Sequence, residues 1–166
     1  MGNREGSRSV MGRTSMSARA LAALAALALV LVSGCGSSSK PLTRAELTTK
    51  ANAICRKVNL KLQAATKKGV GTVQQIAQIA PELASFEETA LVELGKLIPP
   101  VAVESDWKAF VSGAQTLAEN TSKLGEYAKA NNLKRAKNLI KSSTATQQQM
   151  VTIAKRNGLR ECEQIA

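Results

Sequence analysis

Three cysteines, Cys35, Cys55 and Cys162, carry the most reactive side chains of this chain. A thiol can be acylated, oxidised to a disulfide, or used to bind a metal ion. The chain has no histidine, which removes the commonest general base and the commonest metal ligand. Cys55 and Cys162, two isolated cysteines without a histidine nearby, make a poor metal site. The sequence therefore predicts no metal and no other cofactor.

The first cysteine follows an apolar segment. Ala20 to Val32 is an uncharged run of 13 residues. A membrane-spanning helix needs about 20 apolar residues, whereas the apolar region of an export signal has about 7–15. Because the run has no polar face, it does not fit a core helix well. Positive charges typical of an export signal precede it, at Arg4, Arg8, Arg13 and Arg19.

The segment from Leu31 to Cys35 resembles the lipobox of bacterial lipoproteins. Val32, Ser33 and Gly34 match the three positions before the invariant cysteine, and Cys35 matches that cysteine. The resemblance implies that a diacylglyceryl group is attached to the Cys35 sulfur and that the chain is cut after Gly34. An ordinary secretory signal and a core helix ending in Gly-Cys are the alternatives. Three start positions stay open: Met1, Met11 and Met16.

This interpretation divides the chain into three parts. Residues 1–34 are the signal peptide, residues 35–42 are the lipidated cysteine and a polar tether, and residues 43–166 form one domain. The predicted location is the outer face of the cell membrane, with two acyl chains as a stable anchor. The mature chain has 19 Lys and Arg against 11 Asp and Glu, a net charge of +8.

The export signal makes a disulfide between Cys55 and Cys162 the expected state of the remaining cysteines. An even number of cysteines outside the cytoplasm is typical of disulfide pairing. The expected helix positions place Cys162 far from Cys55 unless the chain after residue 157 runs back beside the first helix, or the fourth helix is shifted along the bundle. Either arrangement should bring the Cα atoms to about 4.4–6.8 Å.

Apolar residues recur at steps of three and four along the domain, which is the period of amphipathic helices. Capping residues and turn signals predict four helices, beginning near Thr43, Thr72, Ser105 and Asn132. Short turns between helices of this length indicate an all-α, up-down-up-down four-helix bundle. Pro81 is expected to kink or split the second helix.

Two segments around the cysteines, Ala51 to Cys55 and Arg156 to Cys162, resemble a group of small exported actinobacterial proteins. Members of that group have an early cysteine in the first helix and another near the C-terminus. The resemblance spans most of the mature chain but is loose in its middle. It implies a helical architecture and carries no assigned chemistry.

Two polar groups are candidate sites. Thr121 and Ser143 are expected at one height on neighbouring helices, with Gln147 a turn away, so they either fix the helix register or form a small pocket. The second group consists of basic residues at two helix ends that are expected to meet: Lys61, Lys67, Lys68, Lys134, Arg135, Lys137 and Lys141. These side chains are either a solvated face or a contact for an anionic polymer or protein.

The remaining polar and aromatic features are assigned structural roles. Trp107 and Phe110 are expected to anchor the core beneath the Pro99-Pro100 turn. Four carboxylates of the second helix are interpreted as solvated surface: Glu82, Glu87, Glu88 and Glu93.

No stacking aromatics accompany the basic residues, which argues against nucleic acid. The motifs of common hydrolases and phosphate-binding enzymes are missing, which argues against an enzyme. The expected function is a non-enzymatic, membrane-anchored interaction module. The alternative is a small-ligand receptor with its pocket at Thr121, Ser143 and Gln147.

Overall fold

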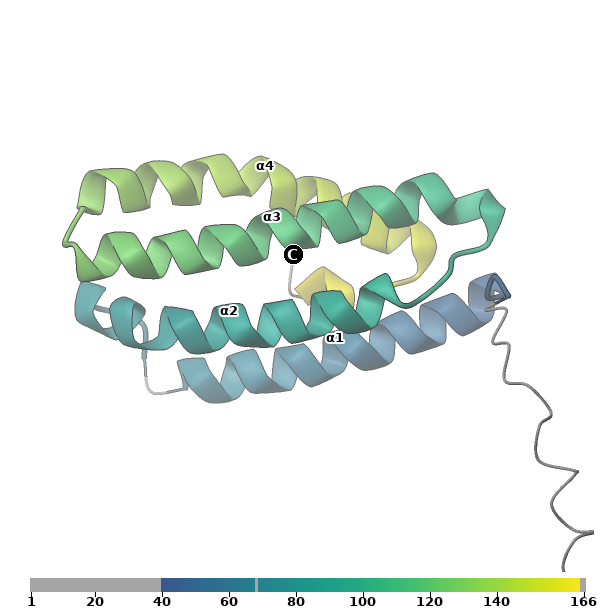
Figure 1. The fold of residues 1–166 in the computed structure, drawn as a ribbon, viewed down its shortest axis with the longest axis horizontal. Helices are drawn as coiled ribbons and strands as arrows, with labels where there is room; N and C mark the ends of the chain where they lie inside the picture. Colours follow the sequence, from purple (N-terminus) through teal and green to yellow (C-terminus); the bar gives the residue numbers. More distant parts are fainter. Residues whose placement is uncertain (1–39, 68, 165–166) are drawn as a thin grey trace, which may run out of the picture. The chain divides into compact units, whose positions relative to one another are not determined.

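The computed structural model describes residues 40–67 and 69–164, which belong to one compact unit. This part of the chain is all-α and contains no strand. Two short 3-10 helices, η1 and η2, accompany four long helices (Figure 1). In chain order the elements are α1 (Arg44–Thr66), α2 (Val73–Gly95), η1 (Val101–Val103), α3 (Glu104–Lys129), α4 (Leu133–Asn157) and η2 (Cys162–Gln164).

Local capping chemistry accounts for where three of the helices begin. The Thr43 hydroxyl accepts from the Glu46 amide, and the Glu46 carboxylate accepts from the Thr43 amide at 2.8 Å, which completes a capping box. Thr72 forms the same arrangement with Gln75 at the start of α2. The Asn132 side chain caps α4. These three predicted starts are confirmed.

The start of α3 differs from the prediction. Ser105 was expected to cap this helix, but α3 already begins at Glu104, and Val103 precedes it without a side-chain cap. The reason is the η1 turn after Pro100, which leads directly into the α-helix. Asp106 nevertheless lies in the first turn of α3, where a carboxylate suits the positive end of the helix dipole.

Pro81 lies inside α2, which continues as one helix from Val73 to Gly95. The helix is therefore not split, and Pro81 itself is solvent-exposed. The neighbouring Ala80 is buried against Gly125 of α3. A Cβ atom placed on Gly125 would lie 2.8 Å from the Cβ atom of Ala80, closer than two carbon atoms pack. The glycine thus permits a close approach of α2 and α3.

The most extensive helix packing is between α2 and α3, followed by α3 with α4 and then α1 with α2 (Figure 1). The other substantial contacts of α1 and α4 are with η2, in the C-terminal segment that follows α4. We call residues 158–164 the tail. Gly158 has a φ of 71°, a left-handed conformation that ends α4 and turns the chain. The tail therefore provides a packing surface shared by the first and last helices.

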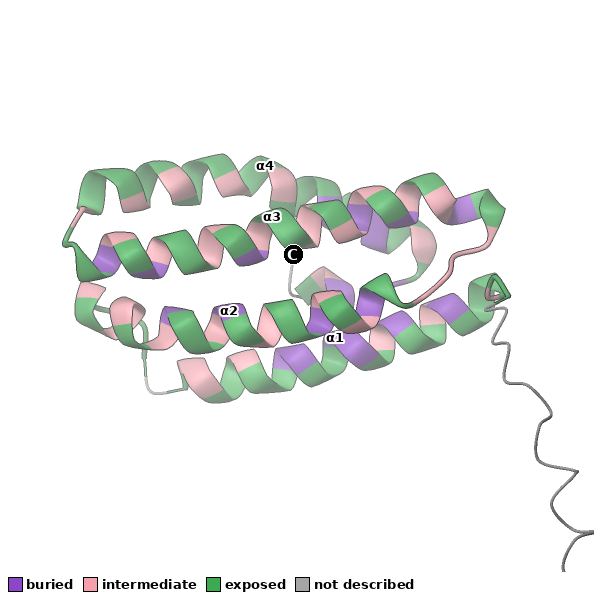
Figure 2. Cartoon of the chain, viewed as in Figure 1, coloured by how far each residue is buried: buried purple, intermediate pink, exposed green. Residues whose placement is uncertain are grey.

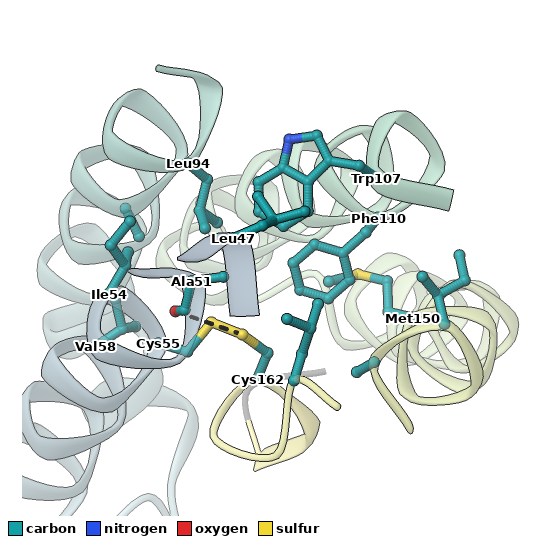
Figure 3. Close-up of a cluster of buried hydrophobic side chains, with 14 of the residues drawn as sticks. Leu47, Ala51, Ile54, Cys55, Val58, Leu94, Trp107, Phe110, Met150 and Cys162 are labelled. Carbon is teal, nitrogen blue, oxygen red and sulfur yellow. Dashed lines mark hydrogen bonds between the residues drawn. A yellow bond between two sulfur atoms is a disulfide. The ribbon is translucent and has the colours of Figure 1, made fainter. Parts of the chain in front are cut away.

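The buried apolar core lies where the tail meets the helices (Figures 2 and 3). Its larger members come from all four long helices and the tail: Leu47, Leu94, Trp107, Phe110, Met150 and Leu159. The Trp107 and Phe110 rings stack with their centroids 5.9 Å apart. Both aromatic residues are buried, so their predicted role as core anchors is confirmed.

Cys55 and Cys162 lie at the centre of this core and are fully buried (Figure 3). Their sulfur atoms are at disulfide distance, 2.10 Å, and their Cα atoms are 5.0 Å apart, inside the predicted range. The tail reaches Cys55 by running back along α1, which was the first of the two predicted routes.

Candidate functional site

A pocket of about 160 Å³, open to solvent, lies among α2, α3 and α4. The three side chains of the predicted polar layer, Thr121, Ser143 and Gln147, all line it. Their predicted equal height on α3 and α4 is therefore matched by the structure. Glu87 of α2 and Asn120 of α3 complete its polar lining. The sequence thus predicted where the polar layer lies, but not that Glu87 and Asn120 belong to it.

The apolar part of the pocket consists of four aliphatic side chains on α3 and α4: Leu117, Leu124, Leu139 and Ile140. Ile140 is an apolar residue of this lining, yet 55% of it is exposed. The reason is that α4 has no buried residue before Met150, so its first half covers little of the core. An exposed isoleucine in the lining gives the pocket an apolar surface that water can reach.

Hydrogen bonds within α3 and α4 fix the two hydroxyl groups of the pocket. The Thr121 hydroxyl donates to the Leu117 carbonyl at 3.1 Å. The Ser143 hydroxyl donates to the Leu139 carbonyl at 2.9 Å and accepts from the Asn120 side-chain amide at 2.9 Å. Because each hydroxyl proton is already used by the helix backbone, what these groups can still offer a ligand is acceptor capacity.

Glu87 corrects the prediction that the carboxylates of the second helix are solvated. Its Oε2 atom is buried and has no hydrogen-bond partner. Burial raises the pKa of Glu87 because it disfavours the charged form. The nearby Thr121 hydroxyl offsets part of that rise, whereas the negative charge of Glu88 adds to it. Helical periodicity alone did not reveal this burial, because it results from the packing of α3 against α2.

The other three carboxylates agree better with the predicted surface role. Glu82 and Glu88 are exposed. Glu93 is partly exposed, and its carboxylate lies 3.6 Å from the Lys57 ammonium group of α1. Of the four, Glu87 alone lines the pocket of the polar layer, whereas Glu88 and Glu93 line other surface pockets away from it.

A second, smaller cavity of about 30 Å³ adjoins the same carboxylate on the core side. Glu87 and Leu117 line both cavities, and the rest of the inner one is apolar, including Val58, Leu94 and Met150. This volume can hold one water molecule, although a stable buried water needs two to four polar partners. Glu87 is thus positioned between a polar outer pocket and an apolar interior.

The predicted basic cluster comes from the end of α1 and the start of α4. These two helices do not pack chiefly on each other, because α1 packs mainly on α2 and α4 mainly on α3. Lys61 and Lys67 are exposed, whereas Lys68 lies outside the described residues. The members on α4 are all exposed: Lys134, Arg135, Lys137 and Lys141. Two of the cations cover aromatic rings, Lys61 over Phe86 at 4.8 Å and Arg135 over Tyr127 at 5.9 Å.

Two asparagines of α1 hold the tail and were not singled out from the sequence. Asn52 donates to the Gly158 carbonyl and accepts from the Glu161 amide. Asn59 is buried and donates to the Glu161 carbonyl at 2.6 Å. Their spacing of seven residues, two helical turns, places both side chains on one face of α1. A polar pair on an otherwise apolar stripe was the available signal for a backbone contact.

The predicted acylation site, Cys35, lies outside the described residues, as does the signal segment. Within residues 40–67 and 69–164, no helix has the length and apolar character needed to cross a bilayer. The same residues contain no group of three or more acidic, cysteine or histidine side chains placed to hold a metal ion. No protein-family model matches the chain, and neither curated proteins nor solved structures give a match.

Proposed function

We propose that this protein is a non-enzymatic receptor for a small ligand, held at the outer face of the cell membrane by a lipid on Cys35. The observation that carries the proposal is the pocket lined by Glu87, Thr121 and Ser143. Leaving a buried polar atom without a partner costs about 1–3 kcal/mol. A ligand in the pocket that supplied a donor to the Glu87 carboxylate would offset part of the cost of burying it, whereas a purely structural role for the polar layer leaves the buried Oε2 atom unexplained.

Export and lipid anchoring are supported by two features of the chain. The uncharged run before Cys35 and the Val-Ser-Gly-Cys sequence fit a lipoprotein signal. Cys55 and Cys162 at disulfide distance fit an oxidising compartment. The tether 35–42 would then connect the lipid to α1, whose first residue is Arg44.

The anchor is tested by the fate of Cys35. We expect mass spectrometry of the membrane fraction to find a mature chain that begins at Cys35 and carries acyl chains. Cys35→Ser should leave an uncut precursor or release the protein. A Cys35→Ser protein that matures normally and stays in the membrane would contradict the anchor without touching the pocket.

We further propose that the four helices form an up-down-up-down bundle with a kink at Pro81. In each neighbouring helix pair, contacts run in opposite residue order, which is the pattern of antiparallel helices. The contacts are Lys57–Glu93 and Lys61–Phe86 between α1 and α2, Ala80–Gly125 and Glu87–Thr121 between α2 and α3, and Asp106–Arg156 and Asn120–Ser143 between α3 and α4.

Spin labels test this topology. Lys67 and Lys129 would lie at the same end of an up-down-up-down bundle, and Lys108 would lie near the other end. All three side chains are exposed, so labels should not disturb the core. Measured by electron spin resonance, the Lys67–Lys129 distance should be shorter than the Lys67–Lys108 distance. The opposite order would contradict the topology.

The receptor function is tested by filling the pocket. Ser143→Trp places an indole in the pocket, while Ser142→Trp places the same group on an adjacent exposed position. The full-length protein in detergent is screened against a mixture of small polar fragments by ligand-observed NMR, after circular dichroism has shown both variants to be helical. We expect fragments that bind the unmodified protein and Ser142→Trp but not Ser143→Trp. Equal binding to both variants, or no binding fragment, would overturn the receptor proposal.

A second candidate is the interaction module, which would contact an anionic polymer or protein of the envelope. It is favoured by the exposure of the basic side chains that begin α4, because cations at a helix N-terminus oppose the helix dipole. Lys134→Glu combined with Arg135→Glu should then abolish retention on an anionic matrix, and retention by the unmodified protein should fall with added salt. Unchanged retention would reduce the cluster to a solvated face.

A further inference from the structure

The Glu87 carboxylate brings hydrogen-bond acceptors to the lining of the pocket. Glu87 Oε2 has no donor within the described residues. The hydroxyl protons of Thr121 and Ser143 are directed to backbone carbonyls of their own helices. The Asn120 amide group donates one of its two N–H groups to Ser143, so Asn120 and Gln147 can each still donate and accept. The unsatisfied group is thus the carboxylate, and a ligand that satisfies it must bring a donor.

The unpaired carboxylate also determines which charge the ligand should have. No lysine or arginine of the described residues forms an ion pair with Glu87. A carboxylate that is buried beside a cavity and lacks an internal cation is stabilised most by a cationic donor. A metal ion fits poorly, because calcium and magnesium take several oxygen ligands and, in the part of the chain that the structure describes, Glu87 is the only carboxylate that lines this pocket.

We propose that the pocket binds a small organic ammonium ion, a protonated amine with a short apolar body, whose ammonium group pairs with the Glu87 carboxylate. This assignment rests on the receptor function proposed above. The body of the amine would lie against Leu124, Leu139 and Ile140, on the apolar side of the pocket. The far end of the ligand would remain open to solvent.

The volume of the pocket limits the size of the amine. An apolar cavity of about 150 Å³ in another protein holds one benzene molecule, and this pocket measures about 160 Å³. A ligand with about six non-hydrogen atoms therefore fills it. n-Butylammonium is a suitable probe, because n-butanol has the same number of non-hydrogen atoms without the charge and butyrate carries the opposite charge.

The chain provides a matched control for the carboxylate. Glu87 and Glu88 are adjacent on α2, but Glu88 is exposed and does not line this pocket. Glu87→Gln removes the pocket charge, and Glu88→Gln removes the same charge from the surface. Binding of each probe to full-length protein in detergent is measured at pH 7 by titration with ligand-observed NMR, with Ser143→Trp as the blocked pocket.

The expected result is that the unmodified protein and Glu88→Gln bind butylammonium at least about tenfold more tightly than butanol, as a charge-assisted hydrogen bond implies. Glu87→Gln should lose this preference. If butanol or butyrate binds as tightly as butylammonium and Ser143→Trp abolishes that binding, the receptor function stands and the ammonium assignment is overturned. If no probe binds in a manner sensitive to Ser143→Trp, both proposals are overturned.

Discussion

Two regions of the domain treat their polar groups in opposite ways. The disulfide region, which comprises the tail and the helix segments around it, buries large apolar side chains and satisfies its polar groups. The pocket region, around Glu87, Asn120 and Ser143, leaves a carboxylate oxygen buried without a partner. Apart from Asn59, the buried residues outside the main core are small: Ala80, Ala84, Ala118, Gly125 and Ala128.

Two carboxylates make this contrast specific. Asp106, in the disulfide region, accepts from the Asn157 amide at 2.9 Å and from the Arg156 guanidinium group at 2.8 Å. The Asn157 and Arg156 contacts lower the pKa of Asp106. Within the described residues the Oε2 atom of Glu87 has no hydrogen-bond partner, and burial raises the pKa of Glu87, a rise that the Thr121 hydroxyl offsets only in part. The comparison shows that the disulfide region satisfies its carboxylate, whereas the pocket region leaves one carboxylate oxygen unsatisfied, which is the feature that the proposed receptor function uses.

The largest effect is expected from removing the disulfide. Cys55→Ala with Cys162→Ala opens a loop with a sequence separation of 107 residues. Removing a native disulfide of this kind typically costs about 2–5 kcal/mol. Urea unfolding of the full-length protein in detergent measures the loss, and hydrogen exchange should rise most at the tail and along α1.

A pocket variant serves as the control for the disulfide. Ser143→Ala removes one partly buried hydroxyl and should change the free energy of unfolding by less than the cysteine pair does. A cysteine-free protein as stable as Ser143→Ala would contradict the view that the disulfide region dominates stability.

Local patterns predicted the helices well, because the chemistry of a helix start is contained in a few adjacent residues. Thr43 with Glu46, Thr72 with Gln75, and Asn132 behave as their types and spacing indicate. The height of Thr121 and Ser143 could also be predicted, since it depends only on distance from a short turn. The burial of Glu87 could not, because a helical stripe gives direction but not how closely the neighbouring helices pack.

Two features at helix ends, the start of α3 and the route of the tail, could not be predicted from local patterns. Ser105 does not cap α3 as predicted, because a 3-10 turn precedes this helix and the helix begins one residue earlier, at Glu104. The tail route to Cys55 stayed open in the sequence, since it depends on the contacts of Asn52 and Asn59 with the backbone of the tail. Such long-range contacts leave only a weak trace, a polar residue on an apolar stripe.

The next largest effect is expected at the close contact of α2 and α3. Gly125→Ala would place a methyl group 2.8 Å from the Ala80 Cβ atom. Overpacking costs about 1–3 kcal/mol, and the better helix propensity of alanine returns up to about 1 kcal/mol. A net loss of roughly 1 kcal/mol in unfolding free energy follows from these two effects. The Gly125→Ala substitution should therefore reduce stability and also disturb the neighbouring pocket.

Gly95→Ala is the matched control for this contact. Apart from its chain neighbours and the backbone of its own helix, no atom of the described residues lies within 4 Å of a Cβ placed on Gly95, at the end of α2. The substitution should leave stability unchanged or raise it slightly. Combining Gly125→Ala with Ala80→Gly should restore part of the loss. If Gly125→Ala is as stable as Gly95→Ala, the two helices do not approach as closely as described.

A smaller effect, visible mainly as a pH dependence, is expected at Asp106. Because the pKa of Asp106 is lowered in the folded protein, its stabilising contribution is present above the ordinary pKa of 3.8 and is lost as pH falls through the folded value. Asp106→Asn should be less stable than the unmodified protein at pH 7 and should converge with it in acid. Melting temperatures at several pH values between 2 and 7 test this, and parallel curves would contradict it.

The smallest effect has the opposite sign and concerns Glu87. Because the pKa of Glu87 is raised in the folded protein, its contribution is fully present below the ordinary pKa of 4.5 and is lost as pH rises through the folded value. Glu87→Gln should therefore match the unmodified protein in acid and exceed its stability at pH 7, by roughly 0.5 kcal/mol, since the amide still needs partners. Glu88→Gln, on the exposed neighbour, should show neither change. If Glu87→Gln is less stable at pH 7, the carboxylate has a stabilising partner within the protein, and the pocket region is not kept ready for a ligand. If it is more stable and also loses butylammonium, the charge is retained at a cost to stability, as expected of a binding residue.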